Sequence, residues 1–145
     1  MLLSSVVNSG SVVVLEKLAA FTEDRHRVLL GNIANLDTPG YRPKDVDLPA
    51  FREALSEALV RQARTGEASP KVEDGPGWQV GPSGRVEVRP VEVEPQNVLF
   101  HDGTNAQAER QMSELAKNAM VHQAALELLR GRYNSMMSAI RGRLE

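Results

Sequence analysis

The segment that decides the fold runs from Met112 to Ile140 and reads MSELAKNAMVHQAALELLRGRYNSMMSAI. Nine of its positions follow one another at alternating steps of three and four residues, and all but the histidine are apolar or aromatic: Met112, Leu115, Ala119, His122, Leu126, Leu129, Tyr133, Met136 and Ile140. This is the 3.5-residue repeat of a coiled-coil seam. It predicts one long helix from about Asn105 to about Arg141, with Thr104 or Asn105 as its N-cap.

A narrow apolar stripe on a long helix needs a second helix to cover it. The N-terminal part offers one from about Val12 to about Leu36, where one row of apolar residues, interrupted by Arg25, consists of Val14, Leu18, Phe21 and Val28. We expect residues 1–10 to be frayed or only conditionally ordered. The predicted fold is therefore mainly α-helical, with long N- and C-terminal amphipathic helices paired as a coiled-coil-like bundle.

The N-terminal helix has a clear stop signal. Pro39 disfavours the helical conformation for the residue before it, so the helix should end at or before Asp37. The sequence TPGY at residues 38–41 places proline and glycine where a type II turn requires them. Asn35 is positioned to cap the helix end, and Asn32 to hydrogen bond to a carbonyl across an interface.

The middle of the chain combines a short helix with a loop or short β-hairpin. Residues Leu48–Arg64 have an amphipathic helical pattern, whereas residues 65–84 are rich in glycine and proline, which predicts a loop. Trp78–Val80 is a candidate partner for Val86–Val88 in a hairpin across the intervening turn. Two interpretations of Trp78 are open: it packs on the nearest helix, which we favour, or it contacts a neighbouring molecule.

Bulk properties exclude several classes of protein. The chain has 145 residues, a net charge of −2 and a pI of about 6.0, which argues against nucleic acid or an acidic membrane as the main partner. Without cysteine it has neither disulfides nor thiolate metal sites. The apolar run Val12–Leu15 is too short for a signal-peptide core or a membrane span, so we expect any export to proceed without a cleaved signal peptide.

No pattern of catalytic residues is present in the sequence. The histidines at positions 26, 101 and 122 do not have the spacing of metal ligands, and no glycine-rich phosphate loop precedes a helix. Function has to be argued from a site, and none is apparent. We therefore expect no enzymatic activity, no cofactor and no small-molecule substrate.

GNIANLDTPGY at residues 31–41 resembles the N-terminal signature of the bacterial flagellar rod and hook proteins, which reads approximately NNIANxxTPGY. ELAKNA at 114–119 and YNSM at 133–136 also resemble the C-terminal part of that family, while KDVD at 44–47 and HDGTN at 101–105 are most similar to its proximal rod members. We expect Asn32, Asn35 and Tyr41 to form hydrogen bonds between subunits or between the helix pair and the middle segment. The resemblance assigns an assembly role to the signature as a whole: Asn32, Ile33, Asn35, Thr38, Pro39, Gly40 and Tyr41.

The resemblance implies a structural subunit of the basal-body rod in the bacterial flagellum. Such a subunit is exported by the flagellar type III apparatus and assembles helically into the drive-shaft tube. Its partners would be FlgC-like rod proteins, FliE, the membrane ring at the rod base and further copies of itself. Residues 1–41 and 105–145 would form the axial core, and residues 42–104 a middle domain.

Two helix stripes at opposite ends of one chain can cover each other or be completed by other molecules. We expect one stripe to be partly unsatisfied in the free subunit and to be covered on assembly. The alternative function is a soluble coiled-coil adaptor or a secretion-system chaperone. The TPGY turn discriminates between the two, because an adaptor has no need of it.

Overall fold

A computed structural model describes residues 2–93 and 103–141 of the chain. It is mainly helical, with two long helices, α1 (Leu2–Ala34) and α3 (Gly103–Arg141), and a shorter one, α2 (Leu48–Thr65). Four short strands form two antiparallel pairs. β1 (Lys44–Asp45) pairs with β4 (Val91–Glu92), and β2 (Trp78–Val80) pairs with β3 (Val86–Val88). The predicted fold class is confirmed.

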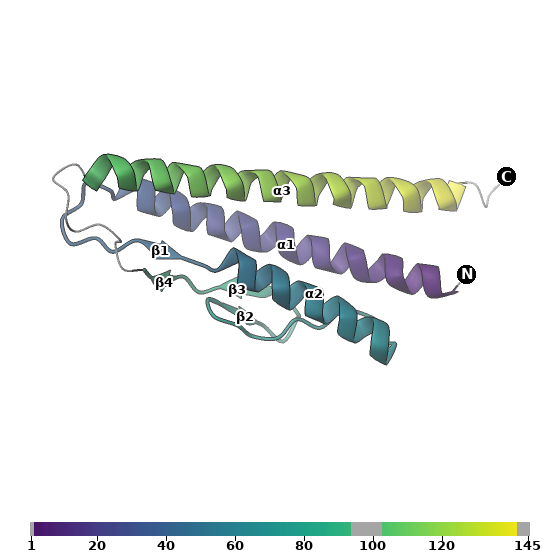
Figure 1. The fold of residues 1–145 in the computed structure, drawn as a ribbon. Coiled ribbons are helices and arrows are strands. Elements are labelled where there is room, and N and C mark those ends of the chain that lie inside the picture. The colour runs from purple at the N-terminus through teal and green to yellow at the C-terminus, as the bar shows by residue number, and fades with distance from the viewer. Residues whose placement is uncertain (1, 94–102, 142–145) are drawn as a thin grey trace.

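Helix α1 is the central element of the molecule (Figure 1). It packs against α3 along one side and against α2, β1 and β3 on another, whereas the backbones of α2 and α3 are not adjacent within the described residues. The two long helices run antiparallel, so the N-terminal end of α1 and the C-terminal end of α3 lie at the same end of the molecule. Every other element is therefore positioned by α1.

Three aromatic rings form the centre of the core between α1, α2 and the hairpin. The rings of Phe21 and Phe51 are stacked, with centroids 3.9 Å apart, and Trp78 meets both rings edge-on. The indole nitrogen of Trp78 donates a hydrogen bond to the carbonyl of Glu73 at 3.0 Å, so its polar group is satisfied although the side chain is buried. The favoured interpretation of Trp78, packing on the nearest helix, is confirmed.

The middle hairpin has the register expected from the sequence. Trp78 pairs with Val88 and Val80 with Val86, so the breaker-rich stretch before residue 84 contains strand β2 as well as loop. The turn between the strands is closed by a hydrogen bond from the amide of Gly84 to the carbonyl of Gly81 at 2.8 Å. The alternation of valine with charged residues was sufficient to predict this pairing because one face of the hairpin is buried.

The boundaries of the long helices differ from the predicted ones. Helix α1 begins at Leu2 rather than near Val12, so the predicted start of the helix is wrong. Gly10 is buried inside α1 because the side chain of Gln62 on α2 occupies the space where a Cβ atom would stand. Helix α3 begins at Gly103, so Thr104 and Asn105 lie inside it and neither is its N-cap.

The short helix α2 begins and ends as its sequence predicts. The side chain of Asp47 accepts a hydrogen bond from the amide of Ala50 at 2.9 Å, which makes it the N-cap. Gly66 ends the helix in the left-handed conformation, with φ of +70°. The buried face of α2 consists of Leu48, Phe51, Leu55, Ala58 and Gln62.

Truncation of the central tryptophan tests this core. Trp78→Ala should lower the free energy of unfolding by about 3–5 kcal/mol, because it removes a buried aromatic side chain and leaves a cavity. Chemical denaturation followed by circular dichroism measures the change. Val60→Ala on the exposed face of α2 is the control and should change the value by less than about 0.5 kcal/mol. Equal effects of the two substitutions would contradict the description of the core.

Candidate functional site

The turn at residues 38–41 reverses the chain after α1. The amide of Tyr41 donates to the carbonyl of Thr38 at 3.2 Å, and Gly40 has φ of +77°, which is the third position of a type II turn. Thr38, Pro39 and Gly40 are exposed, and Tyr41 is partly buried. After the turn, the chain runs back alongside α1. Helix α1 ends at Ala34, which agrees with the prediction that it ends at or before Asp37.

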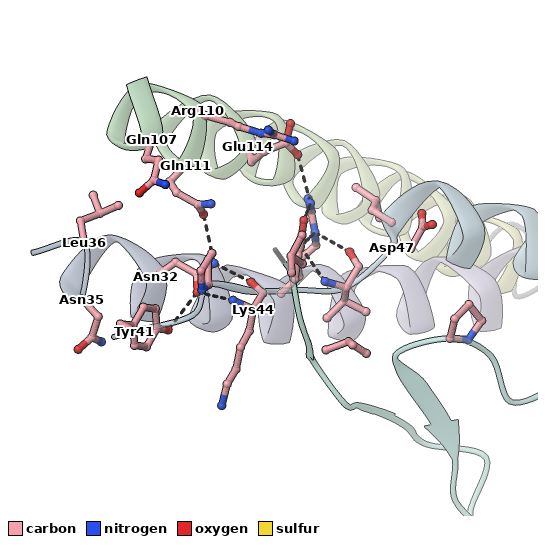
Figure 2. Close-up of a pocket in the computed structure, with 18 of the residues that line it drawn as sticks. Asn32, Asn35, Leu36, Tyr41, Lys44, Asp47, Gln107, Arg110, Gln111 and Glu114 are labelled. Atoms are coloured by element: carbon pink, nitrogen blue, oxygen red, sulfur yellow. Dashed lines mark hydrogen bonds and ion pairs between the residues drawn. The ribbon is translucent and has the colours of Figure 1, made fainter. Parts of the chain in front are cut away.

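Asn32 is the point at which the turn, β1 and α3 meet (Figure 2). Its side chain is fully buried and donates to the carbonyl of Lys44 at 2.6 Å and to Oε1 of Gln111 at 3.2 Å. Its Oδ1 accepts hydrogen bonds from the Tyr41 hydroxyl at 3.0 Å and from the amide of Lys44 at 2.9 Å. The carbonyl that Asn32 was expected to reach across an interface thus belongs to the same chain.

Asn35 caps the end of α1, as its position suggested. Its Nδ2 donates to the carbonyl of Gly31 at 2.8 Å, and its Oδ1 accepts a hydrogen bond from the Thr38 hydroxyl at 3.3 Å. Ile33, the remaining residue of the signature, is partly buried. The signature therefore builds one local structure, the end of α1 and the turn that follows it.

Arg25, which interrupts the predicted row of α1, is a buried connection between three segments. Its guanidinium donates to both carboxylate oxygens of Asp45 at 3.0 and 3.1 Å and to the carbonyl of Val46 at 3.0 Å. It also donates to the carboxylate of Glu114 on α3 at 3.1 Å, and its side chain is only 4% exposed. In the sequence, the only sign of this role was that a charged residue, Arg25, stands at a position of the apolar row.

Further polar groups lie between α1 and α3. Asn118 is fully buried and donates from Nδ2 to the carbonyl of Thr22 at 2.7 Å, while its Oδ1 is buried without a hydrogen-bond partner among the described residues. Nδ1 of His122 lies 2.9 Å from the Thr22 hydroxyl oxygen and 3.2 Å from the carbonyl oxygen of Ala19. Buried polar pairs of this kind fix the register of two helices.

The face of α3 that packs on α1 is displaced by one residue from the predicted seam. Asn118 and Ala125 are buried, whereas the neighbouring seam residue Ala119 is exposed and Leu126 is only partly buried. Asn118 and Ala125 are seven residues apart and so lie on one face, which is rotated by about 100° around α3 from the face of Ala119 and Leu126. On α1 the predicted row of Val14, Leu18 and Phe21 packs into the core with α2 and the hairpin instead of against α3. The residues of α1 that contact α3 include Ala19, Thr22, Arg25 and Asn32.

The rest of the seam on α3 is incompletely covered. Leu115 and Leu129 are partly buried, and the stretch from Gly131 to Arg141 is exposed throughout. Exposure is substantial at three seam residues of this stretch: Tyr133, Met136 and Ile140. The seam therefore overlaps the α1 contact at one side, where His122 lies against Thr22 and the Tyr133 hydroxyl donates to Glu16 at 2.7 Å, while most of its width lies beside that contact.

The ion pairs of Glu114 with Lys117 and Arg25 change the pKa of its carboxyl group. Hydrogen bonds from Lys117 and then from Arg25 lower the pKa of Glu114, although partial burial opposes the shift. A carboxyl group with a lowered pKa stabilises the folded state above its ordinary pKa of 4.5 and loses that contribution as the pH falls below it.

Other kinds of site are not found in the part of the chain that the structure describes. No group of histidine and acidic side chains there has the geometry to hold a metal ion. None of the helices, over the same residues, combines the length and the apolar character needed to cross a membrane. The candidate site is therefore a set of packing and hydrogen-bonding surfaces.

Comparison with known proteins gives relatives of one kind. The chain is 26% identical over 137 residues to the flagellar basal body rod protein FlgB of Bacillus subtilis and 31% identical over 134 residues to that of Aquifex aeolicus. In both cases the match covers 92% of this chain and 95% of the relative. The FlgB of Salmonella typhimurium is 27% identical over 126 residues, with 81% and 83% covered. No protein-family model matches the chain.

The ion pairs predict a specific dependence on pH. Glu114→Gln should lower the free energy of unfolding at pH 7, and the difference from the wild type should shrink as the pH falls below 4.5, where the unfolded wild type takes up a proton, and on through the lowered pKa of the folded protein. Urea denaturation at a series of pH values measures this. Glu127→Gln, which alters an exposed pair with Arg130, is the matched control and should have a smaller effect. A difference independent of pH would contradict the role given to Glu114.

The turn predicts a backbone effect at Gly40. A Cβ atom there would meet no other atom within 4 Å, so any cost arises from the left-handed conformation alone. Gly40→Val should lower the free energy of unfolding by about 1–2 kcal/mol, and Gly40→Asn by less, because asparagine tolerates this conformation better. Thermal denaturation of both variants measures the difference, and equal stability of the valine variant and the wild type would refute the turn assignment.

Proposed function

This chain belongs to the FlgB family of flagellar basal-body rod proteins, and on that premise we propose that it is a structural subunit of the flagellar rod, without enzymatic activity. The relatives that share nearly its whole length are named as rod proteins. The structural observation that supports the proposal is an apolar stripe along α3 that the subunit itself leaves only partly covered.

The α3 stripe is the predicted seam without its histidine: Met112, Leu115, Ala119, Leu126, Leu129, Tyr133, Met136 and Ile140. It lies mostly beside the contact with α1, and both Met112 and Ile140 near its two ends are 57% exposed. Large exposed apolar residues at both ends of the row, with partly buried leucines between them, make it more than a set of scattered surface residues. It supports packing of α3 against a helix of a neighbouring subunit.

The shape of the stripe supports the same mode of assembly. Its 3.5-residue repeat is that of helices that wind around each other with a left-handed supercoil. Contacts between different surfaces of successive copies, when they do not close into a ring, produce a helical filament or tube. We propose that subunits associate in this way, with FlgC-like rod proteins, FliE and the membrane ring at the rod base as further partners.

The proposed division of the chain into an axial part and an outer part follows the arrangement of the elements around α1. Residues 1–41 and 105–145 are proposed as the axial part, and residues 42–104 as a separate outer part. The backbones of α2 and α3 are not adjacent in the described residues and α1 lies between them, which supports this division, although Val121 of α3 also packs against the core that α2 shares. The location that goes with it is the extracytoplasmic rod, reached through the flagellar type III apparatus without a cleaved signal peptide.

The proposal predicts that stripe substitutions block assembly without unfolding the subunit. Met112→Lys and Ile140→Lys change exposed side chains, so their denaturation midpoints should match the wild type, but each buries an unpaired charge in the assembled rod. In a bacterium that lacks its own FlgB, each variant should fail to restore swimming and complete basal bodies in electron micrographs. The seam substitution Leu126→Asp should behave similarly but with some loss of stability, since Leu126 is partly buried.

Ala124→Lys is the matched control for these substitutions. Ala124 is exposed and lies two residues from Leu126, hence on the opposite side of α3. This variant should restore swimming. Normal rods built from the Met112 and Ile140 variants would refute the stripe as an assembly surface, and a purified protein that stops at a small closed oligomer with every rod partner would favour the adaptor alternative.

A further inference from the structure

A pocket of about 630 Å³ lies where the ribbon of β1 and β4 faces the first turns of α3 (Figure 2). Gln107, Gln111 and Glu114 contribute to it from α3, while Asn32 and Asp45 contribute from α1 and β1. The network around Asn32 and Arg25 forms one wall and accounts for the polar groups there. Val91 of β4 and Val93 just after it also line the pocket. The proposed function gives this part of the pocket no role.

The register of the ribbon shows which backbone groups of β4 are not hydrogen bonded to β1. The amide of Val93 donates to the carbonyl of Pro43 at 2.8 Å, and Asp45 faces Val91 two residues further along, so Lys44 and Glu92 form the non-hydrogen-bonded pair between them. The amide and carbonyl of Glu92 therefore point away from β1. Among residues 2–93 and 103–141, no strand pairs with that edge.

Within the described residues, the outer edge of β1, unlike that of β4, is hydrogen bonded to a side chain. There the amide and carbonyl of Lys44 are both bonded to the side chain of Asn32, which pairs with them as a neighbouring strand would. One edge of the ribbon is thus closed by a buried asparagine, and the other, at Glu92, is open among the described residues. An open edge is a template for a further strand.

Exposed apolar side chains flank the open edge. Val91 is 59% exposed and Val93 is 42% exposed, and both line the pocket. In a strand added to this edge, one residue would lie opposite Glu92. The residues before and after it would point to the same face as Val91 and Val93, and so toward the pocket. An open edge and a neighbouring pocket for alternate side chains are the two components of strand-addition sites.

The charge of the pocket restricts what it accepts. Its lining contains three basic and three acidic side chains, and Arg25 is already bound to two of the acids. The lining therefore favours a ligand without net charge. Apolar contact is available from Leu36, Pro43, Pro49, Pro76, Val91 and Val93.

We propose that the outer edge of β4 and this pocket form a strand-addition site for an extended, uncharged segment of another axial subunit, with apolar residues at alternate positions. The backbone of that segment pairs with Glu92, and one of its apolar side chains enters the pocket. The identity of the partner as an axial subunit rests on the proposed function. The site itself rests on the register, the exposed valines and the charge balance.

A capped peptide of alternating threonine and valine tests the site on the full-length monomer by NMR. Resonances of Glu92 and Val93 should shift on titration, and hydrogen exchange of the Glu92 amide should slow by about tenfold, the factor that one backbone hydrogen bond provides. Glu92→Pro removes the outward amide without removing a hydrogen bond of the ribbon, so it should fold normally and lose the peptide. Glu92→Ala keeps the amide and should bind as the wild type does.

Three results would overturn the proposal: no shift with the wild type, equal binding by Glu92→Pro, or an amide of Glu92 that is already protected in the isolated monomer. Circular dichroism of Glu92→Pro checks that the variant folds. The Met112→Lys variant separates this test from that of the rod function, because its stripe is changed and its β4 edge is not. Peptide binding by that variant together with failed assembly is the expected combination.

Discussion

The pairing of α1 with α3 is held in register by buried polar groups, and the rest of the structure depends on that register. Arg25, Asn32 and Thr22 on α1 each have a specific partner on α3. A slip of the helices by one turn would remove the α3 partners of the buried Arg25, Asn32 and Thr22 and leave the buried Asn118 amide unsatisfied, which costs about 1–3 kcal/mol for each unpaired group. The polar contacts therefore select one alignment, which packing of small apolar residues alone would not.

This register has a consequence for the surface of the subunit. Because the polar partners of α1 occupy the face that contains Asn118 and Ala125, the apolar stripe of α3 is turned to the side. The aromatic cluster of Phe21, Phe51 and Trp78 packs on the other side of α1. In the proposed assembly, the exposed residues of the stripe would therefore contact a neighbouring subunit without contributing to that core.

Much of this arrangement follows from local sequence. Pro39 and Gly40 determine where α1 ends and which turn follows, and alternating valines determine the register of β2 and β3. The role of Arg25 was not predictable in this way, because its partners Asp45 and Glu114 lie 20 and 89 residues away in the chain. Periodicity also misplaced the α3 contact by one residue, since it cannot distinguish a stripe that packs on α1 from one that packs on another molecule.

The central claim is that the α3 stripe is open in the subunit and covered in the rod. The chain has no cysteine, so a single one introduced as Met112→Cys or Ile140→Cys is the only thiol available to a maleimide reagent. The account predicts rapid labelling of both positions in the monomer and strong protection in assembled rods, with Ala124→Cys labelled in both states. Protection in the monomer, or labelling in the rod at the rate of the monomer, would contradict it.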